Sequence, residues 1–444
     1  MRYKIFIGWA ALLCVISVAS PASPAGRKFA DLERFPQSAS AYLPISPDAP
    51  ISDYVNQVVY AEEYLRNHFA PWQNEDLSYL DLTFEKIFAF HNSIYKKQYY
   101  TADGAPFAKK SMEALKANAV VDPTSPPRPG VVLSNVDVRV LPMARSLYES
   151  KAAAAGSGGR LKLDVLQNST LKPGEPVALY SSSGDSNWLF IASGVVVGWV
   201  RASAVSMVDQ DFMDAYRYTT HAVITKDNMR VTDDLGKFLY NMKLGTVLPR
   251  DGDGILLPER GKDGMASMWR FIPQEGDAAE FPIPFTPRNA VFAIDQMMGE
   301  PYGWGGALGF RDCSAMTRDY FTLFGIWLPR NSGDQSITGA RISLKNTASE
   351  ERGGIMASRA IPFATLIHMP GHIMLYLGLY DGEPVVFHNT WGVGTNGGRA
   401  VIGRAVVTSL KLGAEIQDKP ANSLLMDRID TLSYPMADIG NISN

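Results

Sequence analysis

The chain has 444 residues, more than a single hydrophobic core usually holds, so several domains are expected. Hydrophobic residues make up 46% and charged residues 20% of the sequence, a composition compatible with a folded and soluble protein. The 42 basic and 45 acidic residues leave a net charge of −3, which excludes a bulk electrostatic attraction to nucleic acid.

The N-terminus has the pattern of a secretory signal peptide. Arg2 and Lys4 precede an apolar run from Ile5 to Val18, which small residues and prolines follow. This run is shorter than the roughly 20 residues that a membrane span needs. We therefore predict a signal peptide over residues 1–25 and export to the periplasm or the exterior, with no stable membrane span. Cys14 leaves a lipoprotein open, although the residue before it is not the small one that a lipobox has.

Residues 26–122 are predicted to form a mainly helical N-terminal domain. Three runs carry apolar residues at helical spacing: Asp53 to Leu65, Phe84 to Tyr95, and Ala108 to Leu115. No combination of residues in this region indicates a chemical reaction. Four prolines between Val121 and Gly130 then mark a domain boundary, because proline neither continues a helix nor pairs within a central strand.

Residues 123–206 change to short β-type runs separated by Gly, Ser and Pro. The predicted strands lie in Asn135 to Pro142, Leu171 to Tyr180, Ser186 to Ile191, and Val195 to Val200. With the Gly198-Trp199-Val200 step, they resemble a bacterial SH3 domain, which is a small β-barrel. The stretch from Ala152 to Gly159 is rich in Ala and Gly, and we expect a flexible loop inserted in this domain.

A weaker second copy of the same pattern is predicted over residues 207–283. Arg230-Val231, after a polar residue, matches Arg139-Val140 of the first copy, and Leu244 to Leu248 matches its later strand. Three tryptophans of the two copies are expected in the barrel cores rather than stacked on a ligand: Trp188, Trp199 and Trp269.

A second proline-rich linker leads into residues 284–444, where the candidate chemistry lies. Pro287 begins a helix, and the chain then passes through a glycine-rich turn, Pro301 to Gly306, to Cys313 at the start of an amphipathic run. At a helix N-terminus, unpaired N–H groups and the helix dipole favour negative charge. Such a position can lower a thiol pKa from about 8.5 into roughly the 3.5–7.5 range. We therefore expect Cys313 to be a reactive thiol.

Once residues 1–25 are removed, Cys313 is the sole cysteine and cannot pair within its own chain. A buried, inert cysteine is the alternative interpretation. The glycine turn and two downstream histidines favour catalysis, with Cys313 as nucleophile, His372 as its base and His388 as the residue that orients the base. Predicted strands carry both histidines, so this domain should combine a nucleophile helix with a sheet in an α+β arrangement.

The C-terminal domain resembles the NlpC/P60 family of cell-wall peptidases, which have a papain-like fold. The matching motifs are Tyr302-Gly303-Trp304-Gly305-Gly306, Asp312-Cys313-Ser314, Leu328-Pro329-Arg330 with Gln335, Gly371-His372 through Gly378, and His388. One branch of that family carries SH3 domains and cleaves the γ-D-glutamyl–diamino acid bond of murein stem peptides. The resemblance implies a Cys-His-His triad and peptidoglycan stem peptides as the partner.

The resemblance also suggests residues that contact the substrate. Asp312 and Ser314 flank the nucleophile, and Asp312 would pair with the free amine of an N-terminal L-Ala. Ser332 and Tyr302 are further candidate contacts. The branch closes the amine end with an aromatic side chain of the first SH3 domain, which cannot be assigned in this sequence, although Tyr148 is one candidate.

Other patterns indicate neither a cofactor nor a metal. The glycines from Gly303 to Gly309 look like a dinucleotide loop, but no apolar strand precedes them. His368 and His372 have a spacing that could place two metal ligands on one helix face, but Pro370-Gly371 breaks such a helix. Two hypotheses remain: a cysteine endopeptidase of murein peptides, and a non-catalytic wall-binding protein with the SH3-like copies as binders.

Overall fold

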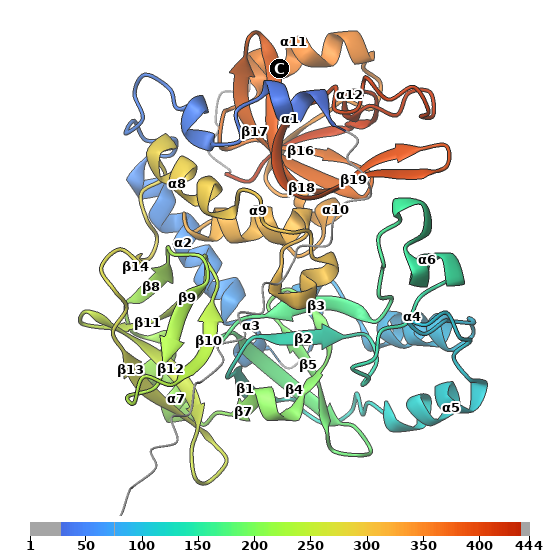
Figure 1. Cartoon of the computed structure of the whole chain (residues 1–444). Helices are drawn as coiled ribbons and strands as arrows, with labels where there is room; N and C mark the ends of the chain where they lie inside the picture. Colours follow the sequence, from blue (N-terminus) through green and yellow to red (C-terminus); the bar gives the residue numbers. More distant parts are fainter. Residues whose placement is uncertain (1–27, 75, 437–444) are drawn as a thin grey trace, which may run out of the picture.

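The computed structural model describes residues 28–74 and 76–436 (Figure 1). It contains a helical N-terminal region, two SH3-like β domains and a C-terminal α+β domain, which confirms the predicted fold class. The predicted signal peptide and Cys14 lie outside the described residues. Within the described ranges, no helix has the length and apolar character to cross a bilayer.

The N-terminal region is a set of helices that spreads over the other domains. Its elements are α1 (Ala30–Arg34), η1 (Ala39–Tyr42), α2 (Tyr54–His68), α3 (Ala70–Gln73), η2 (Ser78–Leu80), α4 (Phe84–Tyr95) and α5 (Lys109–Asn118). Asp53 caps α2 by accepting the Asn56 N–H, and buried Tyr64 of α2 packs into the core of the C-terminal domain. Ile87 of α4 instead packs against the first SH3-like domain. The N-terminal region thus contributes side chains to the hydrophobic cores of the C-terminal domain and of the first SH3-like domain.

The first SH3-like domain is one sheet in the order β3-β2-β6-β5-β4-β1-β7. Its strands are β1 (Arg128–Val132), β2 (Val136–Arg139), β3 (Gln167–Leu171), β4 (Pro176–Ser182), β5 (Trp188–Ser193), β6 (Val197–Arg201) and β7 (Val205–Met207), with η4 (Ala202–Ala204) between the last two. Trp188 and Trp199 are buried in its cores, which confirms their predicted packing role.

The prediction that the first proline linker cannot pair as a central strand is wrong for its last residues. Strand β1 contains Pro129 and lies between β4 and β7. Its pairing with β7 begins only at Gly130, so the missing N–H of Pro129 removes no bond of that ladder. The Pro129 carbonyl still accepts the N–H of Val208.

The expected flexible loop of the first SH3-like domain is instead an ordered arm. It forms α6 (Lys151–Ala155) and η3 (Ser157–Gly159). The Ser150 side chain caps α6, and alanine is the best helix former. This arm rises from the domain and lies against β19 of the C-terminal domain (Figure 1), and its Gly159 carbonyl accepts the indole N–H of Trp391 on the neighbouring strand β18 at 2.8 Å.

The second SH3-like domain follows α7 (Gln210–Arg217) and has two sheets, in the orders β13-β12-β11-β8-β14 and β10-β9. Its strands are β8 (His221–Ile224), β9 (Met229–Thr232), β10 (Phe238–Met242), β11 (Val247–Asp251), β12 (Gly254–Arg260), β13 (Ala266–Phe271) and β14 (Ala278–Glu280). Trp269 is half-buried and packs against the core of this domain, as its predicted packing role requires.

The C-terminal domain is a six-stranded sheet in the order β15-β20-β16-β17-β18-β19, covered by helices. Its strands are β15 (Ala340–Ser343), β16 (Leu366–Met369), β17 (His372–Tyr380), β18 (Glu383–Thr395), β19 (Gly398–Ser409) and β20 (Thr431–Tyr434). Its helices are α8 (Pro287–Met297), η5 (Trp304–Gly309), α9 (Cys313–Thr322), α10 (Ser332–Gln335), α11 (Ser349–Arg359) and α12 (Leu425–Arg428). Helices α8 and α9 share one core with β17 and β18, and Met356 of α11 belongs to another.

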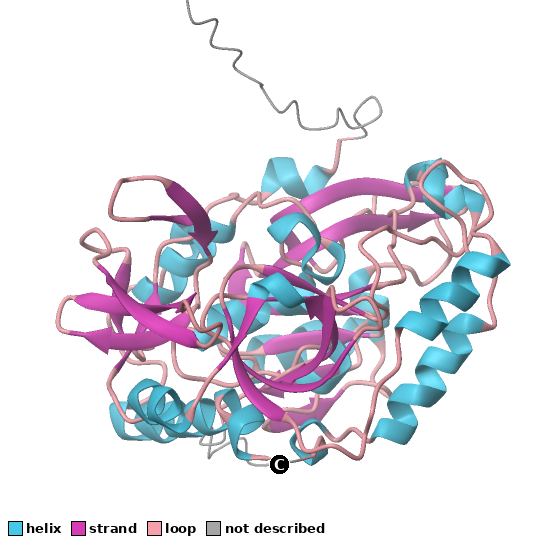
Figure 2. Ribbon diagram, turned by 90° about the horizontal axis from the view of Figure 1, so that it is seen from below, coloured by secondary structure: helices cyan, strands magenta, loops and turns pink. Residues whose placement is uncertain are grey.

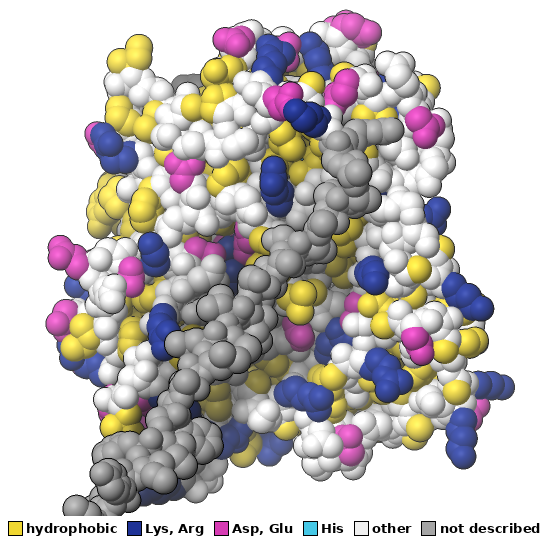
Figure 3. All heavy atoms as spheres, viewed as in Figure 1, with side chains coloured by type: hydrophobic (Ala, Val, Ile, Leu, Met, Phe, Trp, Pro, Cys, Tyr) yellow, Lys and Arg dark blue, Asp and Glu magenta, His cyan; other side chains and the backbone are white. Residues whose placement is uncertain are grey.

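In the view of Figure 2, helices line the right and lower edges, while strands occupy the centre and reach the left edge. On the face shown in Figure 3, basic and acidic side chains are interspersed outside the grey atoms. This mixture agrees with the small net charge of the sequence.

Strand β3 of the first SH3-like domain packs directly on the glycine-rich turn η5. Gly306 in this turn has a φ of +83°, and a Cβ there would overlap the Thr170 hydroxyl of β3. Only glycine fits at this position, because it tolerates a left-handed backbone and leaves room for the facing strand.

We predict that Gly306→Ala destabilises the protein more than Gly309→Ala. Gly309 also has a positive φ, +73°, but a Cβ there meets no neighbour within 4 Å. The control should therefore cost about 1–2 kcal/mol for the backbone alone, and Gly306→Ala about 1–3 kcal/mol more from overpacking. Thermal unfolding of both variants measures this difference, and equal midpoints would show that β3 does not constrain the turn.

Candidate active site

The candidate nucleophile begins a buried helix. Cys313 is the first residue of α9, and Asp312 is its N-cap, with a side chain that accepts the Ala315 N–H at 2.9 Å. The predicted helix thus begins at Cys313, as expected from the sequence. The sulfur lies at the end of the helix where N–H groups remain unpaired.

Arg330 is the main partner of Asp312, and sequence reasoning assigned it no role. Its guanidinium donates to both Asp312 carboxylate oxygens, at 3.1 and 2.7 Å, and to the Ser314 hydroxyl at 2.9 Å. Its Nε donates at 2.8 Å to the hydroxyl of Ser169 in the first SH3-like domain. Burial would raise the pKa of Asp312, but the charge and hydrogen bonds of Arg330 hold it below its ordinary value.

These contacts leave Asp312 little capacity to bind a substrate amine. Its carboxylate accepts five hydrogen bonds: two from Arg330 and one each from Gly305 N–H, Ser314 hydroxyl and Ala315 N–H. A carboxylate has about four lone-pair sites, so this one is saturated. An ammonium group would have to displace a donor and would meet the positive charge of Arg330.

Cys313 is enclosed rather than exposed. Cys313 is 6% exposed and belongs to the largest hydrophobic core of the C-terminal domain. Burial, and then the negative charge of Asp312, raise the thiol pKa to about 12, while the backbone N–H groups of Ile373 and Ser314 and the positive charge of Arg330 act in the opposite direction. The expected lowering of the thiol pKa is therefore wrong for the resting site, because desolvation outweighs the helix terminus.

The structure brings the two candidate histidines together on neighbouring strands that pack against the nucleophile helix. Helix α9 packs on β17, and Ile373, the residue after His372, shares a hydrophobic core with Cys313, so the start of β17 lies against the nucleophile helix. His372 Nε2 lies 2.8 Å from His388 Nδ1 on the neighbouring strand β18. Burial lowers the pKa of His372 to about 4 and that of His388 well below its ordinary value, so both imidazoles are neutral at pH 7.

Tyr302 forms one side of the site. Burial raises its pKa, and the nearby Cys313 and Asp312 raise it further, which places the phenol in their electrostatic reach. Its ring packs edge-on against Trp391, with centroids 6.2 Å apart. The α6 arm of the first SH3-like domain holds this tryptophan through Gly159. Trp391 was not singled out from the sequence, where only an aromatic from the SH3 domain itself was sought.

Two other candidates are not drawn into this cluster. Ser332 begins α10 and is half-buried, and within the described chain its hydroxyl makes no hydrogen bond. Tyr148 is buried, and its backbone pairs with Tyr100 of the N-terminal region at 2.8 and 2.9 Å. Tyr148 thus occupies a junction between domains.

Gln335, quoted in the sequence motif without a role, supports the nucleophile helix. Its side chain donates to the carbonyls of Ser314 and Pro329, both at 2.9 Å, and accepts the Thr317 hydroxyl at 2.7 Å. The motif of Leu328 to Arg330 with Gln335 therefore contains two residues that fix the first turn of α9. The place of Arg330 and Gln335 in this motif was the sequence signal that could have revealed their role.

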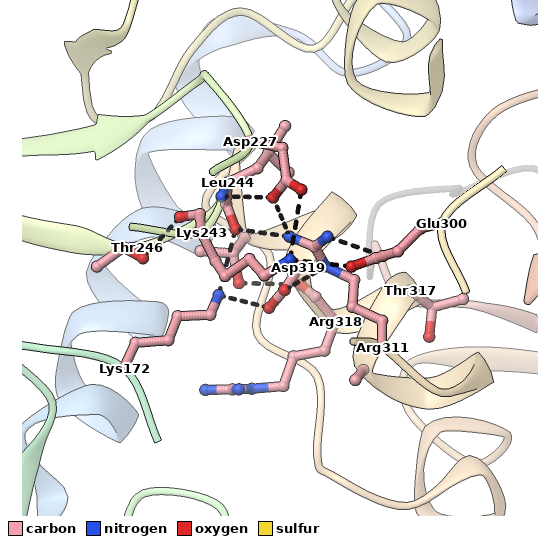
Figure 4. A network of polar contacts seen from close by, with 12 residues as sticks. Lys172, Asp227, Lys243, Leu244, Thr246, Glu300, Arg311, Thr317, Arg318 and Asp319 are labelled. Atoms are coloured by element: carbon pink, nitrogen blue, oxygen red, sulfur yellow. Dashed lines mark hydrogen bonds and ion pairs between the residues drawn. The ribbon is translucent and has the colours of Figure 1, made fainter. Parts of the chain in front are cut away.

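A buried network of charges behind the site joins the two SH3-like domains to the C-terminal domain (Figure 4). Arg311 pairs with Asp227 of the second SH3-like domain and with Glu300 and Asp319 of the C-terminal domain, at 2.7 to 3.0 Å. Lys172 of the first SH3-like domain reaches Asp319 at 2.6 Å. Since Arg311 and Asp312 are neighbours in sequence, the network positions the segment that enters α9.

A metal site is not formed by the described residues. They contain no group of three His, Cys, Asp or Glu side chains that could hold a metal ion. His368, which the sequence spacing placed with His372, lies on β16 and bonds to the Asp430 carboxylate at 2.7 Å.

Comparison with known families finds four matches along the chain. Residues 4–123 match the N-terminal stabilising domain of NlpC/P60 proteins, and residues 299–398 match the NlpC/P60 family. Residues 151–201 match an SH3 domain of the SH3b1 type, and residues 209–253 one of the SH3b2 type. No curated protein matches the chain.

Comparison with solved structures finds further matches. An NlpC/P60 endopeptidase from Photobacterium damselae subsp. piscicida is 23% identical with a TM-score of 0.79, over 90% of this chain and 97% of that one. An NlpC/P60 family protein from Bacillus cereus ATCC 10987 is 18% identical with a TM-score of 0.41, over 61% of this chain and 83% of that one. The first of these supports the fold across all four parts.

We predict that Cys313 reacts slowly with iodoacetamide at pH 7 and that its rate rises steadily with pH. With a pKa raised to about 12, the thiolate fraction at pH 7 is about 3,000-fold below that of an ordinary thiol with pKa near 8.5. A Cys14→Ser background leaves Cys313 as the reporter, and the urea-unfolded chain is the control. A rate that levels off below pH 7 would instead reveal a thiolate–imidazolium pair at rest.

Proposed function

Because the C-terminal domain of this chain belongs to the NlpC/P60 family, we propose that the protein is a cysteine peptidase of peptidoglycan stem peptides. The observation that carries this proposal is the packing of the Cys313 helix on β17, whose first residue, His372, bonds to His388. A nucleophile, a neutral base and a group that holds the base are the parts that acyl transfer needs. Within the bound peptide, we propose the γ-D-glutamyl–diamino acid bond as the one hydrolysed.

The protonation states suggest how the first step proceeds. Cys313 is neutral and His372 is neutral, so the thiol proton passes to His372 Nδ1 as the sulfur attacks the carbonyl carbon. His372 then protonates the leaving amine of the diamino acid, and a thioester remains on Cys313. Water, deprotonated by the same imidazole, hydrolyses the thioester and restores the thiol. His388 keeps the imidazole in place throughout.

The remaining parts of the chain suggest a cell-wall setting. Two SH3 domains precede the NlpC/P60 domain, and we propose that they hold the enzyme at the wall or frame its substrate. Export fits this substrate, and the signal peptide over residues 1–25 stays a prediction. No cofactor enters the proposed reaction.

We predict that Cys313→Ala abolishes hydrolysis of L-Ala-γ-D-Glu-diaminopimelate, because no other described residue supplies the sulfur nucleophile. Release of free diaminopimelate, followed by chromatography, measures it. Cys14→Ser is the matched control and should retain full activity. If neither the unchanged chain nor the control releases product while all three proteins bind isolated walls, the non-catalytic wall-binding hypothesis is favoured.

We predict further that N-acetylation of the tripeptide lowers kcat/KM by less than about tenfold. The free L-Ala amine that the resemblance suggests would rely on Asp312, whose carboxylate is already paired with Arg330. The free and acetylated peptides should be compared at one pH and ionic strength. A loss above a hundredfold would mean that the amine displaces Arg330 and that a free N-terminus is required.

A further inference from the structure

The hydrogen-bonded chain at the site continues beyond the two histidines. His388 Nε2, the ring nitrogen opposite the one that faces His372, lies 3.1 Å from the hydroxyl of Thr408 on β19. That hydroxyl donates to the Ser409 carbonyl at 3.0 Å. His388 and Thr408 are both fully buried. His388 is paired with Val406, so Thr408 is its diagonal neighbour on the adjacent strand.

Assigning the single Thr408 hydrogen to the Ser409 carbonyl sets the direction of every other bond in this series. The Thr408 hydroxyl has a single hydrogen, and the Ser409 carbonyl can only accept it. The hydroxyl oxygen can then act only as an acceptor toward His388, so His388 Nε2 carries a proton. A neutral imidazole carries one proton, which makes His388 Nδ1 an acceptor for the Nε2–H of His372. His372 Nδ1 is therefore left with a free lone pair.

The N-terminal region holds the Ser409 end of this series of hydrogen bonds. Asp31 of α1 accepts both the backbone N–H and the hydroxyl of Ser409, at 2.7 and 2.9 Å. Gln37 exchanges two hydrogen bonds with the backbone of Val407, at 2.8 and 3.1 Å. Strand β19 is the edge of the sheet, so these side chains supply the partners that a further strand would supply.

We propose that Thr408 is a positioning residue that fixes the tautomer of His388 and, through it, that of His372. With the opposite direction of bonds, His372 Nδ1 would carry the proton and could not take one from the thiol. The Asp31 and Gln37 contacts keep β19 in the register at which Thr408 meets His388. The tautomer assignment stands on the hydrogen-bond geometry of two neutral imidazoles, whereas its effect on turnover rests on the proposed function.

Replacing Thr408 by Val and by Ser separates this role from packing. Valine keeps the shape but removes the acceptor, which leaves His388 Nε2–H unpaired and favours the opposite tautomer. We expect kcat to fall about 10- to 100-fold with KM within about twofold, since a buried polar group loses its partner. Serine keeps the hydroxyl and should retain kcat within about threefold. Thermal unfolding checks that both variants fold.

Nitrogen-15 NMR of histidine-labelled full chain gives a readout that needs no substrate. His388, assigned by comparison with His388→Asn, should be protonated at Nε2 in the unchanged chain and in Thr408→Ser, and at Nδ1 in Thr408→Val. An unchanged His388 tautomer in folded Thr408→Val overturns the proposal, as does a Thr408→Ser loss equal to that of Thr408→Val. If the unchanged chain shows no peptidase activity, the proposed function fails, while the NMR result still decides the tautomer.

Discussion

The arrangement of this site depends on the ion pair between Asp312 and Arg330. Asp312 caps the nucleophile helix, and Arg330 holds both carboxylate oxygens while its Nε reaches Ser169 of the first SH3-like domain. A buried carboxylate without this partner would be costly and would place an unpaired charge beside the sulfur. One guanidinium therefore neutralises the cap, orients Ser314 and joins the nucleophile helix to a neighbouring domain.

Behind the site, Arg311 likewise has several partners: it forms ion pairs with three carboxylates, which come from two domains. Buried ion pairs add little net stability, because desolvation of the charges offsets their attraction. They are directional, however, and a wrong domain orientation would leave charges unpaired. We infer that this network specifies how the SH3 domains sit on the C-terminal domain. Gly306 adds a steric requirement on the domain orientation to this electrostatic one, because a side chain at Gly306 would overlap Thr170 of the first SH3-like domain.

The sequence predicted the domain order, the helix that carries Cys313 and the strands that carry His372 and His388. These depend on local periodicity and on glycine and proline signals, which a single sequence displays. The thiol pKa and the partners of Asp312 could not be predicted, because both depend on side chains distant in sequence. Ser169 lies 161 positions from Arg330. The predicted flexible loop is the ordered α6 arm, whose contacts with β19 and Trp391 of another domain no local sequence pattern reveals.

A neutral resting thiol changes what the rest of the site must provide. If the resting site held a thiolate, His372 would be an imidazolium with a proton on each ring nitrogen. The choice between the two neutral tautomers would then not matter at rest. With the thiol pKa raised to about 12, the attack needs a base with its lone pair on the correct nitrogen. That condition is met through buried bonds that run from His372 to His388 and Thr408, and the Ser409 peptide at their end is held by Asp31. A helical region without chemistry of its own is thereby connected to the proton transfer that the proposed reaction requires.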